Sequence, residues 1–145
     1  MSTGSTDQDG AGAARSGLYR TSGTRTPPAE AGLDVVRVSL AGAAHKAALL
    51  ERFAAALAFP DWFGANWDAL EDCLSDLSWR EDRDRLLLIE GFEPLAASAG
   101  DDFRVLLDLL REVAEHWAAQ GRAFRVVFVD PGHRLALPSW RDASA

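Results

Sequence analysis

The chain has 145 residues, of which 48% are hydrophobic, and its formal net charge is -7; this length suits a single hydrophobic core rather than two. The negative charge argues against direct binding of nucleic acid, because that requires a basic face to neutralise phosphates, and it favours a basic partner instead. Cys73 is the only cysteine, which excludes an internal disulfide and a cysteine-based metal site.

Residues 1–32 are predicted to form a flexible leader. They contain six of the twelve glycines together with many serine, threonine and alanine residues. Such a composition buries too little apolar surface to offset the entropy lost on ordering. The segment Gly17–Arg20 holds the only aromatic residue of this leader. It either docks on the folded domain or is an isolated apolar spot, and we favour the second interpretation.

The folded domain is predicted to span residues 33–130. It begins with a strand over Asp34–Leu40, where β-branched residues cluster. Leucine and phenylalanine residues at helical spacing indicate a first helix over His45–Leu57, and Pro60 prevents its continuation. A second helix is expected over Asn66–Leu77, because the side chain of Asn66 is suited to cap its first turn.

The second half of the domain is predicted to contain two further strands, Arg85–Glu90 and Phe124–Asp130. Both are nearly continuous apolar runs, which is typical of strands covered on both faces in a parallel sheet. An amphipathic helix over Phe103–Trp117 lies between them. The order of elements predicts an α/β domain, with a small three-stranded parallel sheet packed with about four helices. Residues 131–145 are expected to form a C-terminal loop or tail that fixes Trp140 on the surface.

The acidic helix around residue 70 is the most informative segment. Pro60–Trp79 contains no basic residue, but it contains Asp61, Asp68, Glu71, Asp72 and Asp76. At helical spacing, Leu70, Cys73, Leu74 and Leu77 share one side and the carboxylates share the opposite side. Like charges one turn apart oppose helix formation by roughly 0.2 to 0.5 kcal/mol per pair. A helix built for stability alone would interleave lysine or arginine, so we expect a partner to use these carboxylates.

Aromatic residues flank this acidic face. A solvated face is the common explanation of an acidic run, and it remains an alternative here. Trp62, Phe63, Trp67 and Trp79 lie beside the acids, and aromatic anchors next to carboxylates are typical of a binding surface. We expect Phe63 and Trp67 to belong to the core instead.

The run from Pro60 to Leu74 resembles the signature of the barstar family, with an aromatic pair, Gly, Asn, then Asp-Ala-Leu and Asp-Cys-Leu. The similarity extends over Asp34–Asp130, since the predicted order of strands and helices is also that of barstar-like proteins. The resemblance implies a barstar-like fold and an antitoxin-like ribonuclease inhibitor. In that family the second helix and the preceding loop block the active site of a barnase-type enzyme.

The resemblance also implies which residues bind the partner. Asp72 matches the central carboxylate of the family, Asp68 its neighbour one turn earlier, and Trp62 the loop aromatic that covers the cleft. A further acid is implied on the long helix at Glu112, or at Glu115 if the alignment slips. The sequence departs from the family in three places: Glu71 stands where an aromatic is expected, Trp62 replaces a tyrosine, and a later aromatic falls at Trp79 or is lost at Leu77. The complete expected partner-binding set is Trp62, Asp68, Glu71, Asp72, Asp76 and Glu112.

Other functions fit the sequence less well. An enzyme would need a nucleophile and a base, and Cys73 falls on the apolar side of its helix, where a thiol is inert. The histidines at positions 45, 116 and 133 lack metal-binding spacing. Carboxylates along one helix do not wrap round an ion, so we expect no metal and no cofactor. The main alternative is a barstar-like module that binds a different basic protein without inhibiting a ribonuclease.

The expected setting is the cytoplasm, with a basic ribonuclease of extracellular type as the partner. The N-terminus has no basic region followed by an apolar run, and no stretch reaches the roughly 18 apolar residues of a membrane helix. We therefore expect neither export nor a membrane contact. The oligomeric state is left open, with a monomer as the default expectation.

Overall fold

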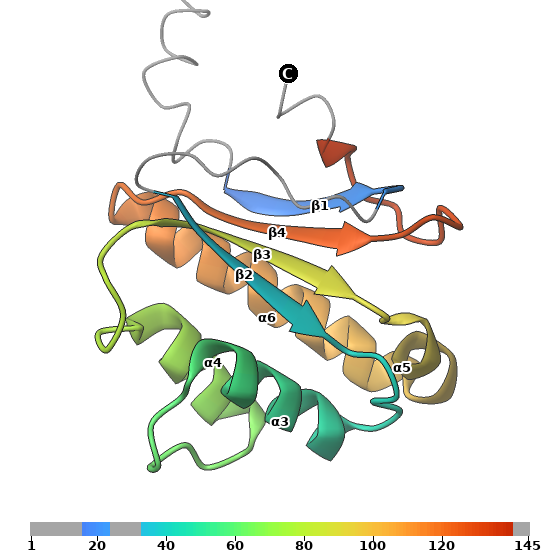
Figure 1. Ribbon diagram of the computed structural model, residues 1–145, viewed down its shortest axis with the longest axis horizontal. Helices are drawn as coiled ribbons and strands as arrows, with labels where there is room; N and C mark the ends of the chain where they lie inside the picture. The colour runs from blue at the N-terminus through green and yellow to red at the C-terminus, as the bar shows by residue number, and fades with distance from the viewer. Residues whose placement is uncertain (1–15, 24–32, 141–145) are drawn as a thin grey trace, which may run out of the picture.

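The computed structural model describes residues 16–23 and 33–140. Within them the chain forms one parallel sheet and four helices (Figure 1). The elements in chain order are β1 (Gly17–Thr21), β2 (Leu33–Ser39), α3 (Lys46–Leu57), α4 (Trp67–Asp76), β3 (Asp84–Glu90), α5 (Glu93–Ser98), α6 (Gly100–Ala119) and β4 (Phe124–Val129). None of the helices in these residues is long and apolar enough to cross a membrane.

The sheet has the strand order β1-β4-β3-β2, and all neighbouring strands are parallel. Helices α3 and α4 connect β2 to β3, and α5 and α6 connect β3 to β4. This arrangement confirms the predicted α/β class, its parallel sheet and the three predicted strands. The short helix α5 was not located from the sequence, because six residues are too few to show a helical repeat of apolar positions.

Strand β1 corrects the prediction of a three-stranded sheet. Gly17–Thr21 pairs in parallel with β4, and Leu18 is buried. These residues therefore belong to the sheet and do not form part of a flexible leader. The composition of residues 1–32 did not predict this strand, because composition reports only how much apolar surface a segment has of its own. Five residues can still become ordered by packing on a core that the rest of the chain supplies. The remaining residues of the predicted leader lie outside the described residues.

Strand β1 is joined to the C-terminal loop as well as to β4. The main-chain N–H of Arg20 donates to the carbonyl oxygen of Pro138 at 2.9 Å. The guanidinium of Arg20 donates from Nε to the carboxylate of buried Asp130 at 3.2 Å. The ring of Trp140 packs edge-on against Tyr19, with 5.1 Å between ring centroids. Residues 131–140 thus follow β4 as a loop, and Trp140 is held against the sheet; the rest of the predicted tail lies outside the described residues.

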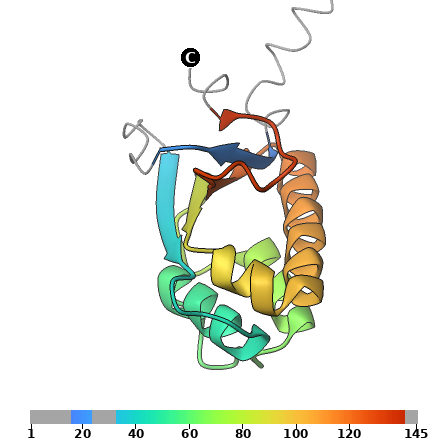
Figure 2. The ribbon, with the colours of Figure 1, turned by 90° about the vertical axis from the view of Figure 1, so that its right-hand side faces the viewer.

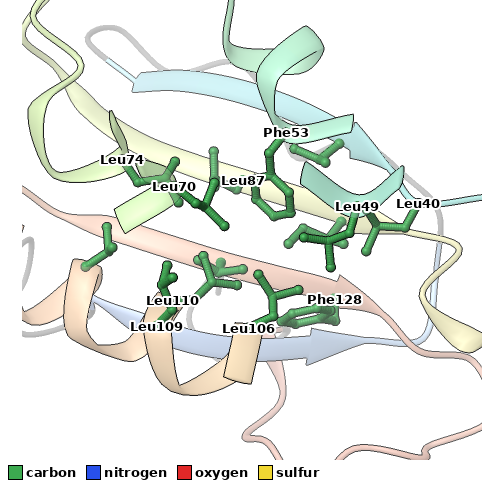
Figure 3. Close-up of a cluster of buried hydrophobic side chains, with 14 of the residues drawn as sticks. Leu40, Leu49, Phe53, Leu70, Leu74, Leu87, Leu106, Leu109, Leu110 and Phe128 are labelled. Atoms are coloured by element: carbon green, nitrogen blue, oxygen red, sulfur yellow. The ribbon is translucent and has the colours of Figure 1, made fainter. Parts of the chain in front are cut away.

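The main core lies between the sheet and the helices, all four of which contribute buried side chains to it. Figure 2 shows the sheet along one side of this core and the helices along the other. Apolar side chains from three helices point toward one another over the strands (Figure 3). They are Leu49 and Phe53 of α3, Leu70 and Leu74 of α4, and Leu106 and Leu110 of α6. The opposite face of the sheet carries a smaller buried cluster of Leu86, Leu88, Val127 and Val129. Strands β3 and β4 are therefore buried on both faces, as their continuous apolar runs predict.

Candidate protein-binding site

Helix α4 is fixed in place by its caps and its apolar side. The side chain of Asn66 accepts a hydrogen bond from the main-chain N–H of Ala69 at 2.8 Å, which confirms its predicted role as N-cap. Leu77 ends the helix in the left-handed conformation, with φ of 50°. Leu70, Cys73 and Leu74 are fully buried. Because one side of the helix is committed to the core, the acidic side faces solvent.

The exposed side of α4 presents the predicted carboxylates. Asp68, Asp72 and Asp76 are exposed, and Glu71 is half-buried. Among the described residues, no arginine, lysine or histidine forms an ion pair with any of them or with Glu112 of α6. Asp76 accepts one hydrogen bond, from the hydroxyl of Ser78 at 3.2 Å. The negative charge of this face is thus not neutralised by the described part of the chain.

Glu112 extends the acidic face from α4 onto α6. Burial raises the pKa of Glu71, and the carboxyl of Glu112 beside it raises that pKa further, as do Asp72 and Asp68. The structure therefore brings Glu112 next to α4. Glu115 instead lines a hollow between α6, β1 and residues 136–138. Of the two acids left open by the sequence, Glu112 is the one that joins the acidic face.

Trp62 supplies an exposed aromatic ring in the loop before α4. It is 62% exposed, which makes it the most exposed large hydrophobic residue of the described part of the chain. Its ring meets that of Trp79 edge-on, with 6.3 Å between centroids. Phe63 and Trp67 pack against the main core, as expected for both. The contact between Trp62 and Trp79 could not be read from the sequence, because the two residues lie in different loops.

Cys73 has the environment of a structural thiol. It is fully buried, and burial raises its pKa, with smaller contributions from Asp72 and Asp76. A thiol in this setting is a poor nucleophile. No group of three His, Cys, Asp or Glu side chains in the described residues could hold a metal ion. The exposed carboxylates of α4 and α6 can instead accept hydrogen bonds from cationic groups of another molecule, and Trp62 offers an exposed flat ring in the loop before α4.

The fold is a small parallel α/β domain with exposed carboxylates on α4, Glu112 of α6 next to Glu71, and exposed Trp62 in the loop before α4. Comparison with protein families identifies that fold: residues 33–129 match the family model described as Barstar (barnase inhibitor). The chain therefore belongs to the barstar family, whose members are inhibitors rather than enzymes. The match confirms the resemblance seen in the sequence and extends from β2 to β4. Strand β1 and residues 130–140 lie outside it. A comparison with curated proteins gives no match.

Proposed function

We propose that this protein inhibits a barnase-type ribonuclease by inserting α4 and the loop before it into the basic active site of the enzyme. The observation that carries this proposal is the acidic face of α4 and α6, which pairs with no basic side chain among the described residues, together with exposed Trp62 in the loop that leads into α4. Family membership supplies the class of partner, a ribonuclease of barnase type. The protein itself catalyses nothing in this proposal.

The chemistry of a ribonuclease explains why such a face would inhibit it. The enzyme must hold a phosphodiester and stabilise its transition state, so its cleft concentrates arginine, lysine and protonatable histidine. Carboxylates at helical spacing can occupy the positions intended for phosphates and accept charge-assisted hydrogen bonds from arginine. RNA is then excluded because its binding site is filled.

Each residue of the face has a separate part in the proposal. Asp72 lies at the centre of the exposed side and binds the arginine that would hold the scissile phosphate. Asp68 and Glu112 flank it from α4 and α6, and the ring of Trp62 covers the edge of the cleft. Glu71 and Asp76 add charge that speeds encounter with a basic enzyme. This contribution weakens with salt, because exposed charges are screened beyond a Debye length of about 8 Å at physiological ionic strength.

A second candidate function is binding to a different basic protein without any effect on a ribonuclease. The same acidic face supports it, because carboxylates and a tryptophan also suit other cationic surfaces. The departures of this chain from the family at Glu71 and Trp62 favour a partner that differs from barnase itself. In either case we propose that the protein acts in the cytoplasm, where an inhibitor would guard the producing cell against an enzyme destined for export.

Calorimetric titration against barnase and several related microbial ribonucleases tests the proposal. Asp72→Ala should weaken binding by more than about a hundredfold, because loss of one member of a buried ion pair costs about 3 kcal/mol or more. Asp101→Ala is the matched control: it removes the same charge from a carboxylate at the start of α6 that is 98% exposed and pairs with Arg104.

An RNA cleavage assay completes the test. Tight binding should abolish cleavage, and Asp72→Ala should restore it while Asp101→Ala still inhibits. Circular dichroism and a denaturation curve must show that both variants remain folded. Failure of the wild-type protein to bind any of these enzymes would contradict the inhibitor proposal and favour a different basic partner.

A further inference from the structure

We propose that Trp79 is a positioning residue for Trp62, holding the exposed ring in the orientation in which it meets the partner. Trp79 lies in the loop after α4 and is itself half-buried against the main core. The predicted effect on affinity rests on the proposed function. The predicted effect on the order of the Trp62 ring concerns the free protein alone.

A ladder of four aromatic rings connects Trp62 to the core. Phe63 and Phe59 lie at its inner end and pack edge-on, with 4.9 Å between centroids. Phe59 meets Trp79 at 6.0 Å and 86°, and Trp79 meets Trp62 at 6.3 Å and 87°. Edge-to-face contacts at these distances are attractive, because the positive edge of one ring faces the negative face of the next. Trp79 therefore links the exposed ring of Trp62 to the inner rings of Phe59 and Phe63.

The indole of Trp79 is fixed by a hydrogen bond as well as by its ring contacts. Its Nε1–H donates to the carbonyl oxygen of Leu57 at 3.0 Å. Leu57 is the last residue of α3, and carbonyls in the last turn of a helix have no partner within it. The bond thus satisfies an acceptor that the end of α3 leaves open. It also connects the loop after α4 to the end of α3.

The residue after Trp79 anchors the same loop to the sheet. The guanidinium of Arg80 donates from Nε and Nη2 to the carboxylate of Asp34, at distances of 3.0 to 3.2 Å. Buried Arg85 donates from Nε to the same carboxylate at 3.1 Å. With its main chain held at Arg80 and its indole held at Leu57, Trp79 forms a fixed surface against which Trp62 rests.

A fixed surface matters because Trp62 is otherwise open to solvent. An exposed side chain that samples several rotamers must be ordered on binding, and this ordering lowers affinity. A ring already held in one orientation avoids that loss. Removal of the Trp79 ring should therefore weaken partner binding by about three- to tenfold, even though Trp79 itself need not touch the partner.

The order of Trp62 in the free protein is the first measurement. We would label the tryptophans with nitrogen-15 and record the heteronuclear NOE of the Trp62 indole, assigned by its disappearance in Trp62→Phe. The NOE should be high in the wild type and should fall in Trp79→Leu. Trp79→Phe keeps a ring against Trp62 and should preserve most of it. Trp140→Leu removes an edge-on indole contact on the opposite face of the sheet and is the control.

A double-mutant cycle on the dissociation constant is the second measurement. Trp79→Leu should weaken binding three- to tenfold in the wild-type background and have little further effect in Trp62→Ala, because the two residues act through one ring. Equal losses in both backgrounds, or an unchanged NOE of Trp62 in Trp79→Leu, would overturn the proposal. If the wild-type protein binds no ribonuclease, the proposed function fails, and the NOE alone decides whether Trp79 positions Trp62.

Discussion

Replacement of Asp130 by alanine is expected to destabilise the folded protein by about 3 kcal/mol. Asp130 has no exposed surface, and its carboxylate accepts hydrogen bonds from Nε of Arg20 at 3.2 Å and from the main-chain N–H groups of Arg134 and Leu135, both at 2.8 Å. Alanine would leave all of these donors without their acceptor. Removal of one partner of a buried ion pair costs about 3–5 kcal/mol. Arg20 keeps its bond from Nη2 to the main-chain oxygen of residue 130, so the lower end of that range applies.

The pH dependence of this effect follows from the pKa of Asp130. Burial alone would raise that pKa, but the N–H groups of Arg134 and Leu135 and the guanidinium of Arg20 outweigh it and hold the pKa below its usual range. A carboxyl with a lowered folded pKa stabilises the folded state above its unfolded pKa of about 3.9. This stabilisation is lost as the pH falls through the folded value. The difference between wild type and Asp130→Ala should therefore shrink below about pH 4.

Urea denaturation at pH 7 and at several values below pH 5 measures both effects. Asp108→Ala is the control, because Asp108 is 69% exposed and pairs with Arg111 at the surface; such pairs contribute about 0–1 kcal/mol. A loss in Asp130→Ala no larger than in Asp108→Ala would refute the argument that this buried carboxylate joins β1, β4 and the C-terminal loop.

Three further changes test other parts of the structure. Gly91→Ala should destabilise the protein by about 1–3 kcal/mol in urea denaturation, because residue 91 has a φ of 73° and a Cβ there would lie 2.8 Å from the main-chain nitrogen of Ala41; a wild-type midpoint would contradict this. The thiol of Cys73 should react with a chromogenic disulfide reagent only after unfolding, since it is buried and its pKa is raised; rapid reaction of the native protein would be the opposite result. Glu71→Gln should stabilise the isolated protein at pH 7 by about 0.5 kcal/mol, because the raised pKa of Glu71 means that its ionisation opposes folding. This gain should disappear below the unfolded pKa of about 4.3, and a loss of stability at pH 7 would show that neither burial nor the neighbouring carboxylates oppose the ionisation of Glu71.

Local features made α4 and strands β2, β3 and β4 predictable from the sequence. Asn66 caps α4 through a bond to a residue only three positions away, and the apolar stripe of α4 repeats within one helix. Strand β1 could not be predicted in this way. Its order depends on β4, whose residues are more than one hundred positions distant, as in the pairing of Leu18 with Val126. A pairing over that separation leaves no periodic signal in five residues.

The candidate site was likewise predictable from the sequence only where its residues belong to one element. Helical spacing alone placed Asp68, Asp72 and Asp76 on the exposed side of α4. Neither the approach of Glu112 to Glu71 nor that of Trp79 to Trp62 could be obtained from spacing. Each of them joins two elements whose relative position depends on the packing of the core. The resemblance to the family implied a binding acid at Glu112 or Glu115. The structure places Glu112 next to Glu71 and Glu115 at the hollow lined by residues 136–138, so only the first of them extends the acidic face.

The two segments outside the family match lie away from the acidic side of α4. Strand β1 and residues 131–140 lie at one end of the molecule, while α3 and α4 lie at the other (Figures 1 and 2). Both segments are fixed to β4 and to each other through Arg20, Asp130 and Trp140. The acidic side of α4, in contrast, is supported by a core that it shares with α3 and α6. The contacts that fix the edge of the sheet therefore involve none of the carboxylates of α4. This separation lets α4 keep like charges that oppose its own folding, because the energy that holds it in place comes from its buried leucines rather than from its surface.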